Sequence, residues 1–238
     1  MKRREIILRL ESLEDPSACP GMEKFGITAN RVYGIRIPVL RELAAEIGRD
    51  HDTALWLWDH DSRETRILAG MIGEPGRLTL QQMEDWANDF DSWEVCDQCC
   101  MNLFKKVPAA YAMTGEWSRR NKEFVKRAGF VLMACLAVSD KEAPAERFLE
   151  FFPYILREAG DPRNYVKKAV NWALRQIGKR DIVLNRASRR LAEDIRAQGT
   201  PSARWIAADA LRELESPAVQ VRLEKRRRKE QVKKGSEG

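Results

Sequence analysis

The residues best suited to chemistry lie together in the stretch DSWEVCDQCC, residues 91–100, which holds three of the chain's five cysteines. A structural zinc site needs four Cys or His ligands at tetrahedral spacing. This chain has no second C-x-x-C, and its two histidines lie elsewhere. A thioredoxin-type motif would need a βαβ pattern around it, which is missing. A helix here would bury one apolar face, made of Val95, Cys96, Cys99, Cys100 and Leu103. We therefore expect core cysteines and no metal ion.

Two other residues of this stretch, Trp93 and Asp97, lie at the edge of the apolar face. They are four residues apart, so a helix projects them side by side. A carboxylate beside an aromatic ring is a pair suited to binding a cation. On spacing alone, a core tryptophan beside a solvated aspartate is the simpler interpretation, and both stay open.

A second aromatic residue, Trp172, lies in the helix expected over YVKKAVNWALRQIGKR, residues 165–180. Its core face would be Val166, Ala169, Val170, Ala173 and Ile177. The opposite side carries Tyr165, Lys168, Trp172, Arg175 and Lys179. Bases around an aromatic ring suit a phosphate backbone, through ion pairs and stacking. Packing of Trp172 against a neighbouring helix, with the bases solvated, fits equally well.

Arg127 precedes a long uncharged segment, residues 128–139, in a helix that is apolar nearly all round. A buried arginine needs a carboxylate or phosphate partner, because an unpaired charge there costs several kcal/mol. A structural salt bridge is the simpler interpretation for this residue alone.

The elements that position these residues are all helices, since no segment shows the alternation of a half-buried strand. Gly160 ends one helix, Asp161 is the expected N-cap of the next with Pro162 in its first turn, and Gly178 is its expected end. The same punctuation recurs at residues 199–201. We expect about a dozen helices joined by short connectors.

Four of these helices resemble one another through a shared alanine register, at Ala69, Ala128, Ala169 and Ala207. Successive alanines are 59, 41 and 38 residues apart. Imperfect periods near 40 are typical of HEAT-like helix pairs, whose stacking generates a curved groove. The expected fold is therefore all-α: a right-handed superhelical solenoid of HEAT-like helix pairs with a concave basic groove. A non-repetitive helical bundle is the alternative.

The charge of the chain is concentrated at its end. The net charge is +6, but residues 221–238 hold eight Lys or Arg against three Glu. The remaining 34 basic and 33 acidic residues leave the first 220 residues at +1. We expect a single domain over residues 1–220 and a disordered basic tail over 221–238. Any nucleic-acid contact of the body then depends on where its charges lie.

The composition also indicates where in the cell the protein is located. No apolar run approaches the length of a membrane span, and the opening MKRREIILRLESLE is expected to form an amphipathic helix rather than a signal peptide. An odd number of cysteines without a framework pattern is typical of reduced thiols. We expect a cytoplasmic protein that does not bind membranes, and a monomer, because proteins with a basic groove of this kind usually act as monomers.

Four segments in order resemble the signature segments of the DNA alkylation repair family, the AlkD-like bacterial DNA glycosylases built from HEAT-like repeats. The segments are YGIRIPVLRELAAEI (33–47), SWEVCD (92–97), FVKRAGFV (124–131) and YVKKAVNWALRQIGK (165–179). The similarity extends from about residue 20 to about residue 215. No single motif is diagnostic, but four in the expected order are fairly specific.

The resemblance implies a monofunctional glycosylase that releases cationic N3- and N7-alkylated purines from double-stranded DNA without a cofactor. The family's catalytic aspartate and its tryptophan match Asp97 and Trp93. Its phosphate-contacting arginine matches Arg127, with Lys126 beside it as a one-residue ambiguity. Its second tryptophan matches Trp172.

The bases of the Trp172 helix would then face the DNA backbone, as the resemblance implies for Lys168 and Arg175. Together with the residues around them, the expected DNA contacts are Lys126, Tyr165, Lys168, Arg175 and Lys179. Three positions depart from the family pattern: Ser92, Glu94 and Asn171 stand where an aromatic residue, an aspartate and a glycine are frequent. Two other functions stay open, a non-catalytic protein that binds damaged or branched DNA and a protein-interaction scaffold.

Overall fold

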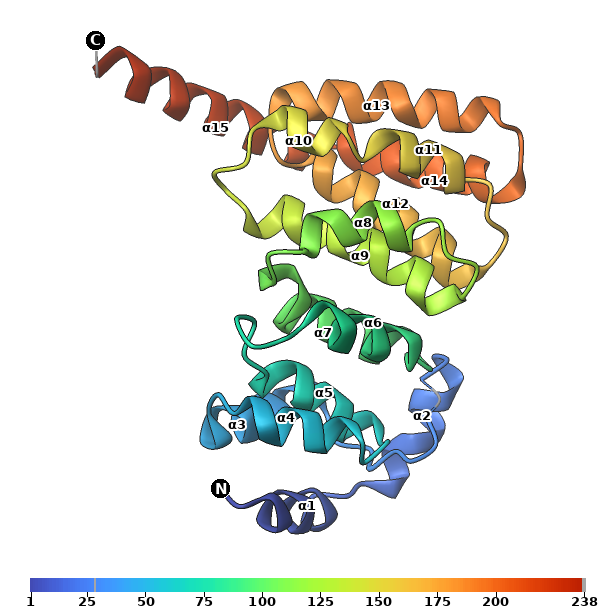
Figure 1. The fold of residues 1–238 in the computed structure, drawn as a ribbon. Coiled ribbons are helices and arrows are strands. Elements are labelled where there is room, and N and C mark those ends of the chain that lie inside the picture. The colour runs from blue at the N-terminus through green and yellow to red at the C-terminus, as the bar shows by residue number, and fades with distance from the viewer. Residues whose placement is uncertain (28, 237–238) are drawn as a thin grey trace. The chain divides into compact units, whose positions relative to one another are not determined.

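The chain is built from helices joined by turns and loops in the structure, a computed structural model that describes residues 1–27 and 29–236 (Figure 1). Side chains are described except at 28, 230 and 232–238. No strand occurs in the described part of the chain, which confirms the predicted fold class as all-α. None of the described helices is both long and apolar enough to cross a membrane. The chain forms two compact units, residues 1–110 and 111–238.

The first unit contains seven α-helices and two 3-10 turns among its described residues. They are α1 (Arg3–Ser12), η1 (Pro16–Ala18), α2 (Cys19–Lys24), α3 (Ile37–Ile47), α4 (His51–Trp58), α5 (Arg63–Ile72), α6 (Leu80–Asn88), α7 (Trp93–Asn102) and η2 (Phe104–Lys106). Helix α5 is buried along its whole length because it packs against α3, α4 and α7. The core of this unit is therefore built around α5.

Two tryptophans add an aromatic stack to this core. The rings of Trp58 in α4 and Trp86 in α6 lie parallel, with 4.1 Å between centroids and 3° between planes. The indole N–H of Trp58 donates to the carboxylate of Asp89 at 2.9 Å. The stack buries two large apolar faces while the polar edge of one ring remains hydrogen-bonded.

The second unit contains the remaining helices. They are α8 (Ala110–Trp117, which begins at the boundary), α9 (Glu123–Ser139), α10 (Ala145–Leu149), α11 (Phe152–Glu158), α12 (Asn164–Gly178), α13 (Ile182–Ala197), α14 (Pro201–Leu214) and α15 (Pro217–Ser236). Helix α12 is the centre of this unit, since it packs against α9, α11, α13 and α14. Residues on α12 are thereby fixed relative to four neighbouring helices.

Small residues allow these helices to approach closely. The alanines of the shared register, Ala69, Ala128, Ala169 and Ala207, are all fully buried. At Gly178, the last residue of α12, an added Cβ would lie 2.7 Å from the side chain of Leu214. Any larger residue there would separate α12 from α14.

One predicted helix start is wrong and two other boundaries are confirmed. Helix α12 begins at Asn164 with Arg163 as its N-cap, rather than after Asp161. The reason is that the Asp161 carboxylate accepts hydrogen bonds from both the backbone and the side chain of Arg163, which fixes a turn ahead of the helix. Gly178 ends α12 as predicted. Thr200 caps α14 by accepting from the N–H of Ala203 at 3.1 Å.

The basic end of the chain is also helical where the structure describes it. Residues 221–236, which we expected to be disordered, continue helix α15 from Pro217. Val219 and Leu223 are buried and attach the first turns of α15 to α13 and α14. Apolar anchoring of this kind supplies stability that an isolated short helix lacks in water.

Candidate nucleic-acid and catalytic residues

In the first unit, Trp93 and Asp97 occupy the first two turns of α7. Ser92 begins the helix by accepting a hydrogen bond from the N–H of Val95 at 3.4 Å. Trp93 is half-buried, and its indole N–H donates to the backbone carbonyl of Phe25 at 3.0 Å. Asp97 lies one turn later with 7% of its surface exposed. A buried carboxylate and an oriented aromatic ring thus follow one another along the helix.

The cysteines beside this pair belong to the core, as predicted. Cys96, Cys99 and Cys100 are fully buried, together with Val95 and Leu103. Burial raises the pKa of the Cys99 thiol well above its usual value, which keeps it protonated. No group of three or more potential metal ligands occurs among the residues that the structure describes.

Glu94, one of the departures from the family pattern, pairs with a buried arginine. Its carboxylate accepts from Nε of Arg63 at 2.6 Å, and Arg63 also contacts Glu64 at 2.7 Å. Burial lowers the pKa of Arg63, but the two carboxylates outweigh it and hold the pKa above its usual value. Glu94 therefore neutralises a charge inside the first unit.

Ser92, another departure from the family pattern, stands where an aromatic residue is frequent. In this chain its side chain caps helix α7 by accepting from the N–H of Val95.

In the second unit, Arg127 connects two helices. It lies on α9 with 6% of its surface exposed, and its Nη1 donates to the backbone carbonyl of Tyr165 at 2.7 Å. The Tyr165 ring lies 5.6 Å from that of Phe124, again between α9 and α12. Arg127 is thus positioned at the first turn of α12.

Lys126, the neighbour of Arg127, has carboxylate partners. Its buried ammonium contacts Glu158 and lies 3.4 Å from the carboxylate of Asp161. Burial raises the pKa of Asp161, but hydrogen bonds from Arg163 bring it below the usual value, so the carboxylate is charged at neutral pH. These contacts favour a structural role for Lys126.

Helix α12 presents the two faces that the sequence predicts. The predicted core residues are all fully buried, namely Val166, Ala169, Val170, Ala173 and Ile177. On the other side, Trp172 is half-buried and Lys168 is exposed. Part of the Trp172 ring is therefore accessible to solvent, on the side of α12 that also carries the exposed Lys168.

The two bases at the end of α12 are held by a carboxylate from α14. Glu213 accepts from Nη1 of Arg175 and from Nζ of Lys179, each at 2.7 Å. Burial raises the pKa of Glu213, but Lys179 and then Arg175 bring it below its usual value. Arg175 and Lys179 are therefore partly neutralised within the protein before any phosphate is present.

A second α14 carboxylate, Asp209, explains the third departure from the family pattern. Asn171 is buried, and its Nδ2 donates to the Asp209 carboxylate at 2.7 Å. Asp209 also lies 3.4 Å from Nη1 of Arg175. Asp209 and Glu213 are four residues apart, so they share one face of α14. That spacing is visible in the sequence, but it does not reveal which helix the face meets.

Phe25 is a residue that the sequence reasoning missed. It is 71% exposed, the largest fraction among the exposed large apolar side chains of the described residues. The next residue, Gly26, has φ 72°, a conformation that favours glycine. Phe25 contacts Trp93 through its backbone carbonyl. Since every residue has such a carbonyl, the amino-acid type at position 25 could not have predicted this contact.

Comparison with known proteins relates this chain to a DNA repair family. One solved structure, described as "a new family of proteins related to the HEAT-like repeat DNA glycosylases with affinity for branched DNA structures", is 15% identical to this chain, with a TM-score of 0.73. The match covers 82% of this chain and 83% of the other, and shows that the chain has a HEAT-like repeat fold. No curated protein sequence matches the chain. The family model for the DNA alkylation repair enzyme matches residues 6–213, and over that length it shows that this chain belongs to the DNA alkylation repair enzyme family.

Proposed function

We propose that the protein is a DNA glycosylase that hydrolyses the N-glycosidic bond of cationic N3- and N7-alkylated purines in duplex DNA. The observation that carries the proposal is the pair on α7. Asp97 is a buried carboxylate one helical turn from Trp93, whose half-buried ring is oriented by the carbonyl of Phe25. Low solvent exposure strengthens the effect of a carboxylate on a nearby positive charge.

The chemistry needs little more than such a carboxylate. An alkylated purine already carries a positive charge, so the C1′–N bond breaks with the electron pair going to a base that leaves neutral. Positive charge then develops on the deoxyribose, as in other glycosyl transfers. Asp97 would stabilise that charge and orient the attacking water, which forms the new C1′–O bond and loses a proton. The Trp93 face adds attraction for the same cation.

Residues of the second unit would hold the DNA. Arg127 is the proposed phosphate contact, and Trp172 the second aromatic contact. The half-buried Tyr165 and the exposed Lys168 lie on the same helix as Trp172. For Arg175 and Lys179, contact with DNA requires phosphates to compete with Glu213. The protein would act as a monomer in the bacterial cytoplasm, with no cofactor.

The deciding experiment is base release from methylated duplex DNA, with free 7-methylguanine and 3-methyladenine separated by chromatography. Asp97→Asn should lower single-turnover release by about 100-fold or more while DNA binding persists. The matched control is Asp85→Asn, which removes an exposed carboxylate of α6. This control should release base at the wild-type rate. Undiminished release by Asp97→Asn would exclude the proposed role of this carboxylate.

A second candidate is a non-catalytic protein that binds branched DNA, because the similar solved structure is described by its affinity for such DNA. Under this alternative the wild-type protein releases no base, yet binds a four-way junction more tightly than a linear duplex of the same length. A protein that shows neither release nor DNA binding would instead be a protein-interaction scaffold.

A further inference from the structure

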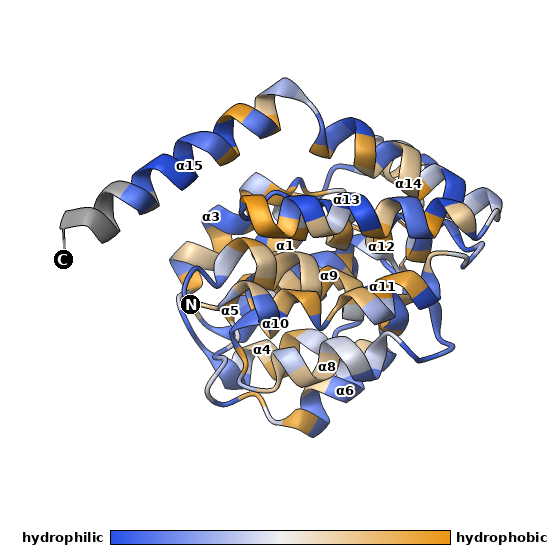
Figure 2. Ribbon diagram, turned by 90° about the horizontal axis from the view of Figure 1, so that it is seen from above, coloured by the Kyte–Doolittle hydropathy of each residue, from blue (hydrophilic) through white to orange (hydrophobic). Residues whose placement is uncertain are grey.

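Helix α15 is attached to the second unit at one end only. Val219 and Leu223 are buried against the body, whereas no described side chain after Leu223 is buried. The helix extends away from the other helices of its unit (Figure 1) and is mostly hydrophilic over the part that Figure 2 colours. The described side chains of α15 beyond Leu223 therefore contribute little to the core.

The exposed part of α15 carries a continuous row of positive charge. Residues 222–229 include six bases and a single acid. Four of the bases share one helical face at positions i, i+3, i+4 and i+7, and all four are exposed. We call this face the basic stripe: Arg222, Lys225, Arg226 and Lys229. The acid, Glu224, lies off the stripe and pairs with Arg227 at 2.9 Å.

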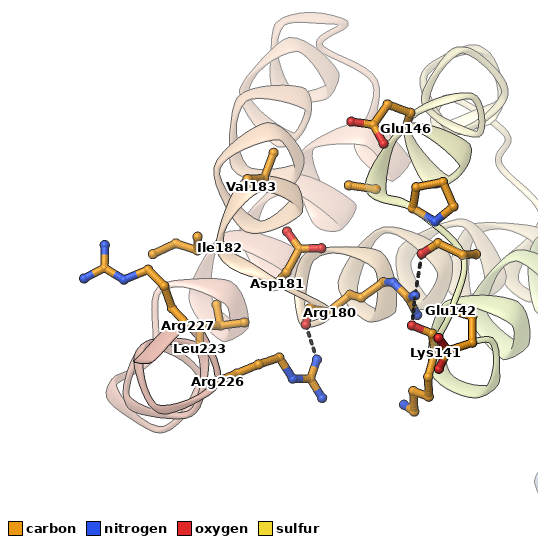
Figure 3. Close-up of a pocket in the computed structure, with 13 residues that line it drawn as sticks. Lys141, Glu142, Glu146, Arg180, Asp181, Ile182, Val183, Leu223, Arg226 and Arg227 are labelled. Atoms are coloured by element: carbon orange, nitrogen blue, oxygen red, sulfur yellow. Dashed lines mark hydrogen bonds between the residues drawn. The ribbon is translucent and has the colours of Figure 1, made fainter. Parts of the chain in front are cut away.

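One member of the stripe also fixes the direction of α15. Arg226 donates to the backbone carbonyl of Arg180, the residue that links α12 to α13. The guanidinium of Arg180 is in turn bound to the carbonyls of Ala137, Lys141 and Ala143. Figure 3 shows the contact of Arg226 with Arg180 beside an open cavity of about 840 Å³, which is lined by residues 141–146 and 180–183 and by Leu223, Arg226 and Arg227 of α15. The stripe therefore has a defined orientation.

The cavity itself is a poor site for an anion. Its walls include Glu142, Glu146 and Asp181, and the last of these caps α13 by accepting from the N–H of Leu184 at 2.8 Å. A phosphate inside the cavity would meet these carboxylates. Arg222, Lys225 and Lys229 are exposed and do not line the cavity, so the side of α15 that carries these three bases is the better surface for an anion.

A row of bases on one face destabilises an isolated helix, because like charges at i, i+4 repel. A polyanion would remove that repulsion, and duplex DNA presents a dense row of phosphates. We propose that the basic stripe of α15 binds the phosphate backbone of duplex DNA without regard to sequence, as a surface separate from the residues assigned to base release. This inference rests on the proposed function in one respect, that the protein acts on DNA.

The test is the salt dependence of duplex binding. The variant Arg222→Gln, Lys225→Gln, Lys229→Gln removes three charges and keeps residues with good helix propensity. Each lost phosphate contact should lower the slope of log K against log salt by about 0.9, so the slope should fall by about 2 to 3. Circular dichroism should show unchanged helix content. Single-turnover base release at saturating DNA should be unchanged.

A control variant separates the stripe from overall charge. Arg4→Gln, Arg9→Gln, Arg196→Gln removes three exposed bases from α1 and α13. An equal loss of slope in the control, or an unchanged slope in the stripe variant, would overturn the inference. Loss of binding by the stripe variant only to phosphatidylserine–phosphatidylcholine vesicles would overturn it too, in favour of an anionic membrane surface. If the stripe variant loses slope while wild type releases no base, the stripe is supported and the proposed base release fails.

Discussion

The indole N–H of Trp93 donates a hydrogen bond to the backbone carbonyl of Phe25 at 3.0 Å, across 68 residues of sequence. The bond joins the start of α7 to the end of α2, where the chain turns at Gly26 with φ 72°. The orientation of an aromatic ring assigned to catalysis therefore depends on a turn in a distant segment. Trp93 thus has two separable properties: its indole N–H holds the ring in place, and its aromatic face is available for contact.

Replacing Trp93 by phenylalanine should separate these two properties. Trp93→Phe keeps an aromatic face but removes the N–H, so the free energy of unfolding should fall by about 1 kcal/mol. Base release should fall by less than tenfold, whereas Trp93→Ala should lose considerably more. Urea unfolding and single-turnover release measure the two effects. Equal losses in both variants would show that the hydrogen bond matters more than the ring face.

Removal of the Lys126 charge should affect stability rather than DNA binding. Lys126→Met leaves the half-buried residues Glu158 and Asp161 with their arginine partners but without this lysine, which should cost about 1 to 3 kcal/mol of unfolding free energy. The matched variant Lys168→Met removes an exposed charge from α12 and should change stability by less than about 0.5 kcal/mol. It should instead lower the salt slope of DNA binding by about 0.9. The reverse pattern would make Lys126 the phosphate contact.

Neutralising Glu213 should strengthen DNA binding. Glu213→Gln removes the carboxylate shared by Arg175 and Lys179 and leaves Arg175 with Asp209 at 3.4 Å, so both bases can pair more readily with phosphates. Duplex affinity should rise, and the salt slope should steepen by about 1 to 2. Glu193→Gln, which removes an exposed carboxylate paired with Arg196, is the control for net charge. An equal gain in both variants would mean that neither base faces DNA.

The same carboxylates should set the acid stability of the second unit. The folded-state pKa values of Asp161 and Glu213 lie below 3.8 and 4.5, their usual values. Between the folded and unfolded pKa values the unfolded state binds more protons, so stability rises with pH there. The contribution is fully present above about pH 5 and is lost as pH falls through the folded values. Denaturant unfolding from pH 6 to pH 3 should show this, with a shallower fall in the variant Asp161→Asn, Glu213→Gln.

The thiols should divide into one accessible group and four protected ones. Cys19 is partly exposed, whereas Cys96, Cys99, Cys100 and Cys135 are buried. A disulfide reagent added to the native protein should modify Cys19 within minutes, and the other four only at the rate of unfolding. Mass spectrometry identifies the modified residues. Rapid modification of Cys99 in the native protein would contradict its place in the core.

Helix positions and faces were largely predictable from the sequence, because the periodicity of apolar residues is local information. The buried residues of α12 follow from that pattern, and so does its end at Gly178. Its start was predicted wrongly because the Asp161 carboxylate serves a turn, and the same residue type serves turns and helix caps. The helical continuation of α15 depends on the burial of Val219 and Leu223 against other helices, which local pattern does not reveal.

For the candidate site, the sequence predicts which residues share a helix but not what each one contacts. The spacing of Trp93 and Asp97 predicts that they lie side by side on one helix, whereas their selection as a candidate catalytic pair came from the resemblance to the family. The pairing of Arg175 with Glu213, 38 residues later, depends on how α12 and α14 cross. The bond from Trp93 to Phe25 involves a backbone carbonyl, which every residue has. The first contact limits how far Arg175 is available to a phosphate, and the second sets the orientation of the Trp93 ring. Local sequence pattern reveals neither of them.

The parallel stack of Trp58 on Trp86 makes the first unit optically distinguishable. Two indoles with centroids 4.1 Å apart interact strongly through their electronic transitions, which is expected to give a paired band in the circular dichroism spectrum. Both rings lie within residues 1–110, so this band reports on the unit that carries Asp97. Followed beside the far-ultraviolet signal of the whole chain during heating, it would show whether the two units melt together or one after the other.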